Sequence, residues 1–245
     1  MEENIFDSWL INSFIAHRGI HNNKDVPENS LTAFKLAIEK GYPIELDIRM
    51  LNDGTIVVFH DELMSRMTNA NKYIQNLTKA DLDKYKLLNT EEKIPTFEEV
   101  LNLINGQVPL LIEIKKENTK TGDFERKILK MLNEYNGEYA IQTFNPYVLE
   151  WFKNNAPHIK RGILSSFFKG EKMSCIRKFA LKRLYMIKKY QPDFISYDCR
   201  NLPNRFVNRY KKLPLLAWTV KSQEQYERVV KYCDNIIFQD FEPKI

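Results

Sequence analysis

The sequence predicts a single (β/α)8 barrel, the TIM-barrel class of α/β fold, and three observations support this prediction. Short apolar runs alternate with amphipathic stretches, which indicates strands alternating with helices and a parallel sheet. The predicted strands are apolar over most of their length, as in a sheet that is covered on both faces. The chain has 245 residues, and about 250 residues is typical of one such barrel. We therefore expect residues 1–245 to form one domain.

An open doubly wound sheet is the alternative α/β arrangement, and the glycine content argues against it. The chain holds only 8 Gly, and neither GxGxxG nor GxxxxGK[ST] occurs in it. Nucleotide-binding sheets of that class need such glycines at the turn that holds the phosphates. The barrel is the better prediction.

Nine apolar runs predict the strands. In chain order they are 14–18, 43–49, 56–60, 108–115, 138–143, 160–165, 193–197, 214–220 and 235–238. Amphipathic segments between them predict helices at 30–40, 96–105, 123–135, 146–155, 172–190, 203–211 and 222–232. Capping boxes begin two of these helices, with Thr96 and Glu99 in one and Ser222 and Gln225 in the other. Residues 61–95 are polar and lack this rhythm, so we expect a small insertion there.

Charge and cysteine content indicate the compartment and the kind of partner. Lys and Arg number 37 against 32 Asp and Glu, a net charge of +5 that suggests an anionic partner. Three widely spaced cysteines fit neither a disulfide framework nor a CxxC metal site. The acidic start MEENIFDSWLINS does not resemble a signal peptide, and no apolar run is long enough to span a membrane. These features predict a soluble, cytoplasmic protein.

Ionisable side chains at strand ends are the main indication of function. Residues two apart share a face of a strand, so Glu45 and Asp47 point together, opposite the flanking aliphatic residues. The same pattern places Glu113 and Lys115 on one face of a later strand. In a barrel the carboxyl ends of the strands carry the active site. We therefore expect these residues to converge there.

Carboxylates that converge in a poorly solvated site repel one another unless a positive charge lies between them. Oxygen ligands of this kind favour a hard divalent cation, Mg²⁺ or Ca²⁺. Thiolates or several imidazoles, which would indicate zinc, are not present at suitable spacing. The alternative is a buried ion-pair network in which Arg18 and Lys115 neutralise the acids.

Two histidines also end predicted strands, each beside another ionisable group: His17 next to Arg18, and His60 next to Asp61. An isolated histidine is usually a core or surface residue with no chemical role. Two imidazoles near a metal and two fixed cations, however, are suited to phosphodiester cleavage. One imidazole removes a proton from the attacking oxygen, and the other protonates the leaving alkoxide. We therefore propose His17 and His60 as catalytic residues.

An ordered set of short motifs resembles the signature of the glycerophosphodiester phosphodiesterase family. In chain order the motifs are His17-Arg18-Gly19, Pro27-Glu28-Asn29-Ser30, Glu45-x-Asp47, Asp53-Gly54, His60-Asp61, Arg66-x-Thr68-Asn69, Ile94-Pro95-Thr96, Glu113-x-Lys115, Gln142-x-Phe144 and Trp218-Thr219. The resemblance runs over roughly residues 14–240. The last strand departs from the family pattern, with Asn235 in place of a glycine, and residues 161–200 match least.

This resemblance implies a barrel that hydrolyses glycerophosphodiesters to glycerol 3-phosphate and an alcohol, with one divalent metal. It implies that the metal ligands are Glu45, Asp47 and Glu113, that His17 and His60 are general base and general acid, and that Arg18 and Lys115 contact the phosphate. It further implies that the glycerol hydroxyl beside the phosphate attacks first and forms a cyclic phosphodiester, which water then opens. The leaving alcohol, the choice of metal and the oligomeric state are not indicated.

A basic segment and a tryptophan lie outside this set. Residues 167–190 hold eight Lys or Arg and one Glu, with Ile176, Ala180, Leu184 and Ile187 in an apolar stripe at helical spacing. A barrel helix with a solvated basic face explains the segment, and a surface that contacts anionic lipid is the alternative. No nucleic-acid recognition pattern accompanies it. Trp218 belongs either to the substrate pocket, packed on the glycerol carbons, or to the core.

Two further functions fit the same residues. A hydrolase resembling a lysophospholipase D would act on lysophospholipids at a membrane surface, where the basic and phenylalanine-containing segment 167–190 contacts an acyl chain. A protein of a different class would be a barrel that has lost activity and serves as a binding protein. The glycerophosphodiester phosphodiesterase is the leading prediction. All seven expected catalytic, phosphate-binding and metal-binding residues are present, which argues against the inactive barrel, whereas activity on lysophospholipid above that on deacylated diesters would indicate the lysophospholipase.

Overall fold

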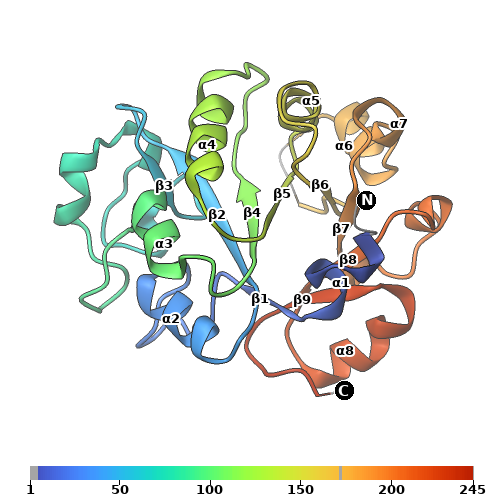
Figure 1. Cartoon of the computed structure of the whole chain (residues 1–245), viewed down its shortest axis with the longest axis horizontal. Coiled ribbons are helices and arrows are strands. Elements are labelled where there is room, and N and C mark those ends of the chain that lie inside the picture. Colours follow the sequence, from blue (N-terminus) through green and yellow to red (C-terminus); the bar gives the residue numbers. More distant parts are fainter. Residues whose placement is uncertain (1–4, 171–172, 245) are drawn as a thin grey trace. The chain divides into compact units, whose positions relative to one another are not determined.

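Figure 1 shows the computed structural model, which describes residues 5–170 and 173–244. The chain divides into two compact units, one of residues 16–139 and one of residues 1–15 with 140–245. Strands and helices alternate through both units in the order of a (β/α)8 barrel, with one additional strand, β3. The predicted fold class is therefore confirmed, and each unit is described by itself below.

The unit 16–139 is built around β2 (Ile44–Met50). This strand pairs in parallel with β1 (Ile15–His17) and with β4 (Leu110–Ile114), and antiparallel with the short β3 (Ile56–Val58). The helices are α2 (Leu31–Glu39), α3 (Phe97–Ile104) and α4 (Asp123–Glu134). The predicted capping box begins α3, where the hydroxyl of Thr96 accepts from the amide of Glu99 and the Glu99 carboxylate accepts from Thr96.

The insertion 61–95 lies in this unit and contains no strand or α-helix in the described residues. It consists of three short 3₁₀ helices, Met64–Arg66, Ile74–Asn76 and Lys79–Lys84, joined by turns and isolated bridges. Its apolar residues share one core cluster with residues of β3 and its flanks. The cluster contains Leu51, Val57, Phe59, Met64, Met67, Ile74, Leu77, Leu82, Leu87 and Ile94. The insertion is thus anchored by burial of aliphatic side chains rather than by a ladder of hydrogen bonds.

The described residues of the second unit form five strands, which pair in parallel in chain order. They are β5 (Tyr139–Thr143, in this unit from Ala140), β6 (Arg161–Ser165), β7 (Phe194–Asp198), β8 (Leu215–Val220) and β9 (Asn235–Phe238). Its helices are α1 (Trp9–Asn12), α5 (Pro146–Asn155), α6 (Cys175–Lys182), α7 (Ile187–Tyr190) and α8 (Gln223–Val229). Asn235, the departure from the family pattern, donates to the carbonyls of Leu10 and Ser13, both at 2.7 Å. The amide side chain thereby connects the start of β9 to α1.

Two helix predictions need correction. The expected helix 172–190 is two helices, because α6 ends at Lys182 and Leu184 adopts a left-handed conformation with φ of 58°. Residue 172 lies outside the described residues. The turn buries Leu184 completely, whereas Ile176 of the predicted apolar stripe is 83% exposed. Burial of Leu184 thus overrides the helical pattern in the first segment. The segment 203–211 forms only a 3₁₀ helix, Val207–Tyr210.

Among the helices of the described residues, none combines the length and apolar character needed to cross a bilayer.

Candidate active site

Three carboxylates converge in the unit 16–139 because of the register of its strands. Asp47 of β2 lies directly opposite Glu113 of β4, and Glu45 lies opposite His17 of β1. One oxygen of each of the three carboxylates lies within 4.8 Å of the other two, and all three residues are buried. The pattern of alternate residues on neighbouring strands therefore brings together the acids that the sequence singled out.

Two cations contact these acids from neighbouring positions. The ammonium Nζ of Lys115 lies 2.6 Å from Oε1 of Glu113 and 3.1 Å from Oδ1 of Asp47. The guanidinium Nε of Arg18 lies 3.1 Å from Oδ2 of Asp47, and the backbone amide of Arg18 donates to Glu45 at 3.2 Å. Arg18 has a φ of 58°, a left-handed conformation that costs energy in a side-chain-bearing residue and is often found at functional sites.

The two cations and burial shift the pKa values of these acids in opposite directions. Burial alone would raise the pKa of Asp47, but Lys115 and Arg18 outweigh it and hold the pKa well below its usual range. Burial, followed by repulsion from Asp47 and Glu113, raises the pKa of the Glu45 carboxyl well above its usual range. Two cations therefore leave one of three buried carboxyls poorly compensated. An oxygen-only donor set with surplus negative charge fits a hard divalent cation.

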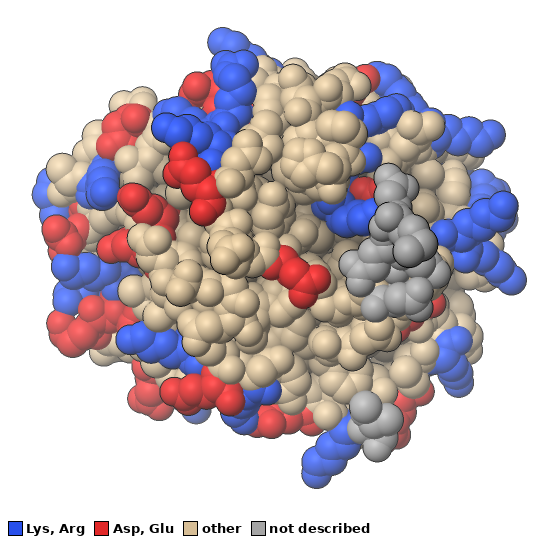
Figure 2. Space-filling view, viewed as in Figure 1, with Lys and Arg blue, Asp and Glu red and all other residues tan. Residues whose placement is uncertain are grey.

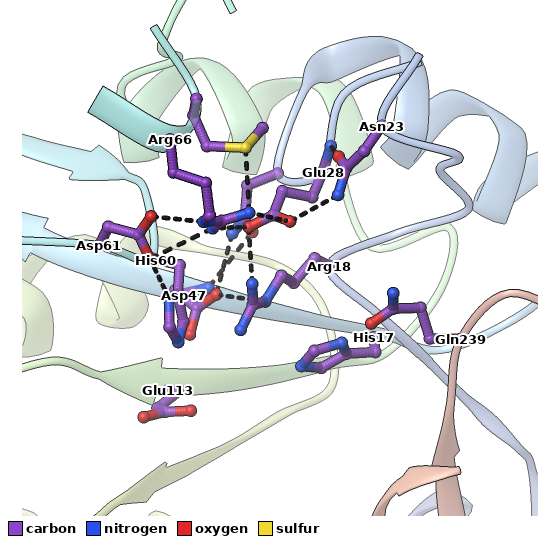
Figure 3. Close-up of polar contacts among 12 residues, drawn as sticks. His17, Arg18, Asn23, Glu28, Asp47, His60, Asp61, Arg66, Glu113 and Gln239 are labelled. Atoms are coloured by element: carbon purple, nitrogen blue, oxygen red, sulfur yellow. Dashed lines mark hydrogen bonds and ion pairs between the residues drawn. The ribbon is translucent and has the colours of Figure 1, made fainter. Parts of the chain in front are cut away.

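Glu28 joins two guanidinium groups beside this centre (Figure 3). Its carboxylate accepts from Arg18 at 2.6 Å, from both terminal nitrogens of Arg66 at 2.6 and 2.9 Å, and from the amide of Asn23 at 2.8 Å. Burial acts to raise the pKa of Glu28, but the hydrogen bonds from Arg66 and the charge of Arg18 lower it strongly. Glu28 therefore stays ionised and fixes the position of Arg18.

His60 forms the end of a second chain of contacts (Figure 3). Its Nδ1 lies 2.6 Å from Oδ1 of Asp61, and Arg66 donates through Nε to the other oxygen of Asp61 at 2.6 Å. An ionised carboxylate only accepts, so Nδ1 carries the proton and Nε2 holds the lone pair in the neutral ring. Burial and the nearby charge of Lys115 lower the pKa of His60. Asp61 and Arg66 therefore fix the orientation of the His60 ring, so that Nε2 is the ring nitrogen available for proton transfer.

The structure places six further predicted residues with His60 in one unit and places Trp218 in the other. His17 ends β1, with Nε2 4.0 Å from Oε2 of Glu45. Trp218 lies within β8, where its ring meets the edge of Phe144 at 5.6 Å between centroids. Trp218 and Phe144 line a cavity of about 520 Å³ together with Phe167, Phe168 and Leu181. The sequence predicted the acids and cations on the strands, and these do lie together.

The sequence did not assign roles to Glu28, Asn29, Asp61 or Arg66. The first three contact the predicted residues Arg18, Asp47 and His60, and Arg66 reaches them through Glu28 and Asp61. Asn29 donates to Asp47 at 2.9 Å. All four residues belong to motifs that carry the family resemblance, and this was the available signal. Their partners could not be deduced from the pattern, because loop and insertion residues follow no strand or helix period.

Comparison with known proteins agrees with this geometry. The model of the glycerophosphoryl diester phosphodiesterase family matches residues 17–242. The chain belongs to this family. A glycerophosphodiester phosphodiesterase of Caldanaerobacter subterraneus subsp. tengcongensis is 35% identical over 94% of this chain and 95% of its own. One from Bacillus subtilis (strain 168) is 27% identical over 93% of this chain and 83% of its own.

Solved structures show the same fold. A phosphodiesterase of Oleispira antarctica, determined in complex with the product sn-glycerol-3-phosphate, superposes with a TM-score of 0.79 at 22% identity, covering 94% of both chains. At this identity the likeness concerns the fold alone. The predicted family, the barrel fold and the assignment as a phosphodiesterase-family enzyme are thereby confirmed.

Proposed function

We propose that the protein hydrolyses a glycerophosphodiester to glycerol 3-phosphate and an alcohol in a metal-dependent reaction. The observation that carries this proposal is the buried group Glu45, Asp47 and Glu113 with Lys115 and Arg18 in contact. The proposal is supported by the names of the curated relatives and by the product bound to the phosphodiesterase of Oleispira antarctica.

Glu45, Asp47 and Glu113 would hold one divalent cation, Mg²⁺ or Ca²⁺. When bound, such an ion stabilises negative charge that develops on the phosphoryl oxygens. Arg18 and Lys115 would contact the phosphate, since each already has its positive charge directed at the acids of this centre. A phosphate that enters would share these cations with the carboxylates.

His17 and His60 would move the protons. In the first step the glycerol hydroxyl beside the phosphate attacks phosphorus and gives its proton to one imidazole, while the other imidazole protonates the departing alkoxide. In the second step water attacks the cyclic phosphodiester with the two roles exchanged, which restores both imidazoles and releases glycerol 3-phosphate. Asp61 would keep His60 in the required tautomer through the 2.6 Å contact.

A lysophospholipid substrate is the second candidate, and one observation favours it. The unit that contains β5–β9 has a cavity of about 520 Å³, whose mixed lining includes Phe167, Phe168, Met173 and Leu181, apolar side chains suited to contact an acyl chain. Activity on lysophospholipids that exceeds activity on deacylated diesters would support this substrate. We further propose that the enzyme folds as one domain and that it is cytoplasmic. The three free cysteines are consistent with a reducing compartment.

A substrate panel tests the reaction directly. Purified protein is incubated with glycerophosphocholine, glycerophosphoethanolamine, glycerophosphoglycerol and lysophosphatidylcholine, each with Mg²⁺, with Ca²⁺ and with chelator, and the glycerol 3-phosphate or lysophosphatidate released is measured. We expect chelator-sensitive release. His17→Ala should lower kcat by roughly 10²–10⁴-fold, whereas His158→Ala, at an exposed position, should not. Release from none of the substrates would favour the inactive binding protein.

A further inference from the structure

We propose that α6 and the turn after it form a docking surface for an anionic lipid bilayer. This surface, called the α6 surface below, comprises residues 173–190 of the unit that contains β5–β9. Its apolar side chains face water to an unusual degree: Ile176 is 83% exposed, and Phe179 and Tyr185 are each 52% exposed. Isolated exposed apolar residues are ordinary, but three within ten residues form a patch of the kind that marks an interaction site.

The charge of the α6 surface is of one sign. Its basic residues are Arg177, Lys178, Lys182, Arg183, Lys188 and Lys189, and residues 173–190 contain no Asp or Glu. Figure 2 shows Lys and Arg side chains gathered at the edge of the molecule where α6 and α7 lie. An acid from outside the segment, Glu150, pairs with Lys189 at 3.1 Å. The remaining positive charge is complementary to an anionic surface.

Local packing explains why these apolar side chains are left outside. α6 ends at Lys182, and the left-handed Leu184 redirects the chain so that Leu181, Leu184 and Ile187 become buried. Ile176 and Phe179, one turn apart on α6, consequently do not reach the core. The guanidinium of Arg183 lies 3.5 Å from the centroid of the Phe179 ring. Cationic and apolar groups are therefore interleaved on one short helix, as on helices that lie in a membrane interface.

A lipid surface fits these observations better than a nucleic acid. Phosphates of a nucleic acid would pair with the lysines and arginines but leave Ile176 and Phe179 in water. An anionic bilayer accepts both, because headgroups neutralise the cations and the acyl boundary removes the apolar side chains from water. α6 also forms one wall of the cavity of about 520 Å³, to which it contributes one cation, Arg177, and one apolar side chain, Leu181.

Vesicle flotation of the full chain tests the proposal without reference to its reaction. We expect the protein to float with phosphatidylcholine vesicles that contain about 30% phosphatidylglycerol and not with pure phosphatidylcholine vesicles, and to be released by high salt. Ile176→Ser with Phe179→Ser should lower the partition coefficient at least tenfold. Lys178→Glu with Lys188→Glu should lower the partition coefficient more than the two serine substitutions do, because each basic residue near the surface raises this coefficient about fivefold.

Matched control variants distinguish binding through the α6 surface from nonspecific adsorption to vesicles. Val230→Ser with Tyr232→Ser alters two residues of the same unit that are each 42% exposed, and Lys221→Glu with Lys231→Glu reverses two exposed charges there. Both should bind vesicles like the wild type. Absence of binding to the anionic vesicles, or binding that Ile176→Ser with Phe179→Ser leaves unchanged, would overturn the proposal. Binding of a short duplex DNA that depends on the same lysines and displaces the protein from the vesicles would also overturn it.

Discussion

At the scale of single residues, the Glu28 carboxylate joins two guanidinium groups: it accepts hydrogen bonds from both Arg18 and Arg66 while it is 5% exposed. Glu28→Gln keeps the shape and removes the charge. The two guanidinium groups then lose their common partner, and the position of Arg18 is no longer fixed. We expect kcat/KM to fall about 10–100-fold and the free energy of unfolding to fall by about 2–3 kcal/mol.

Diester hydrolysis assays combined with urea denaturation measure both effects of Glu28→Gln. Glu91→Gln is the control, since the Glu91 side chain is 95% exposed in its ion pair with Lys86 and such pairs contribute at most about 1 kcal/mol. If both variants leave kcat/KM and unfolding unchanged, Glu28 does not position Arg18.

Asp61 permits a prediction about pH. Burial acts against its ionised form, but hydrogen bonds from His60 and Arg66 lower the pKa of Asp61 from 3.8 to about 2. A carboxyl with a lowered pKa stabilises the fold fully above its unfolded pKa, and this contribution is lost as pH falls through the folded value. Asp61→Asn should therefore cost about 1–2 kcal/mol at pH 7, discounted for partial exposure, and about half as much at pH 3.

Urea denaturation of wild type and Asp61→Asn from pH 7 down to pH 3 measures this difference. A difference that is the same at both ends of the range would show that the carboxyl titrates normally in the folded protein. The effect on kcat should be larger than the effect on stability alone suggests, because Asp61 also orients His60.

At the scale of elements, the sequence predicts strands better than helices in this chain. The alternation Ile44-Glu45-Leu46-Asp47 determines which side chains face together, so the strand and its site residues follow from the same period. The end of α6 has no such signal, since it depends on whether Leu184 can be buried. The partners of Glu28 and Arg66 likewise depend on the path of two loops, which no periodicity describes.

Gly162 in β6 gives a prediction about strand packing. A Cβ at this position would lie 2.1 Å from Cε2 of the Phe194 ring, and Phe194 is completely buried in β7. Gly162→Ala must therefore displace the ring or separate the strands, at a cost of about 1–3 kcal/mol. Gly41→Ala is a contrasting variant, because nothing lies within 4 Å of its Cβ and its φ of 69° confines the cost to backbone strain.

Thermal or urea denaturation measures both glycine variants. A larger fall in stability for Gly162→Ala than for Gly41→Ala identifies close packing of β6 on Phe194 as the constraint. Equal losses would show that the Phe194 ring moves aside at little cost, because Gly162 is not among the glycines with a left-handed φ.

Over the whole molecule, the net charge of +5 is the sum of regions with opposite local charge. The α6 surface has an excess of cations, whereas three carboxylates with two cations are buried in the unit 16–139. A buried excess of negative charge opposes folding, and any cation that binds only the folded protein offsets this cost. Metal binding should therefore be visible in the stability of the entire chain, independently of catalysis.

We expect Mg²⁺ or Ca²⁺ at about 100 times its Kd to stabilise the chelator-treated protein by about 2.7 kcal/mol, which raises Tm by about 5–10 °C for a chain of this length. Differential scanning calorimetry measures the shift. Asp47→Asn should abolish it, because the variant removes one carboxylate of the buried group, whereas Glu91→Gln should preserve it. If the metal raises the Tm of Asp47→Asn as much as that of the wild type, the ion binds elsewhere in the protein. The buried carboxylates are then an ion-pair network that Arg18 and Lys115 neutralise.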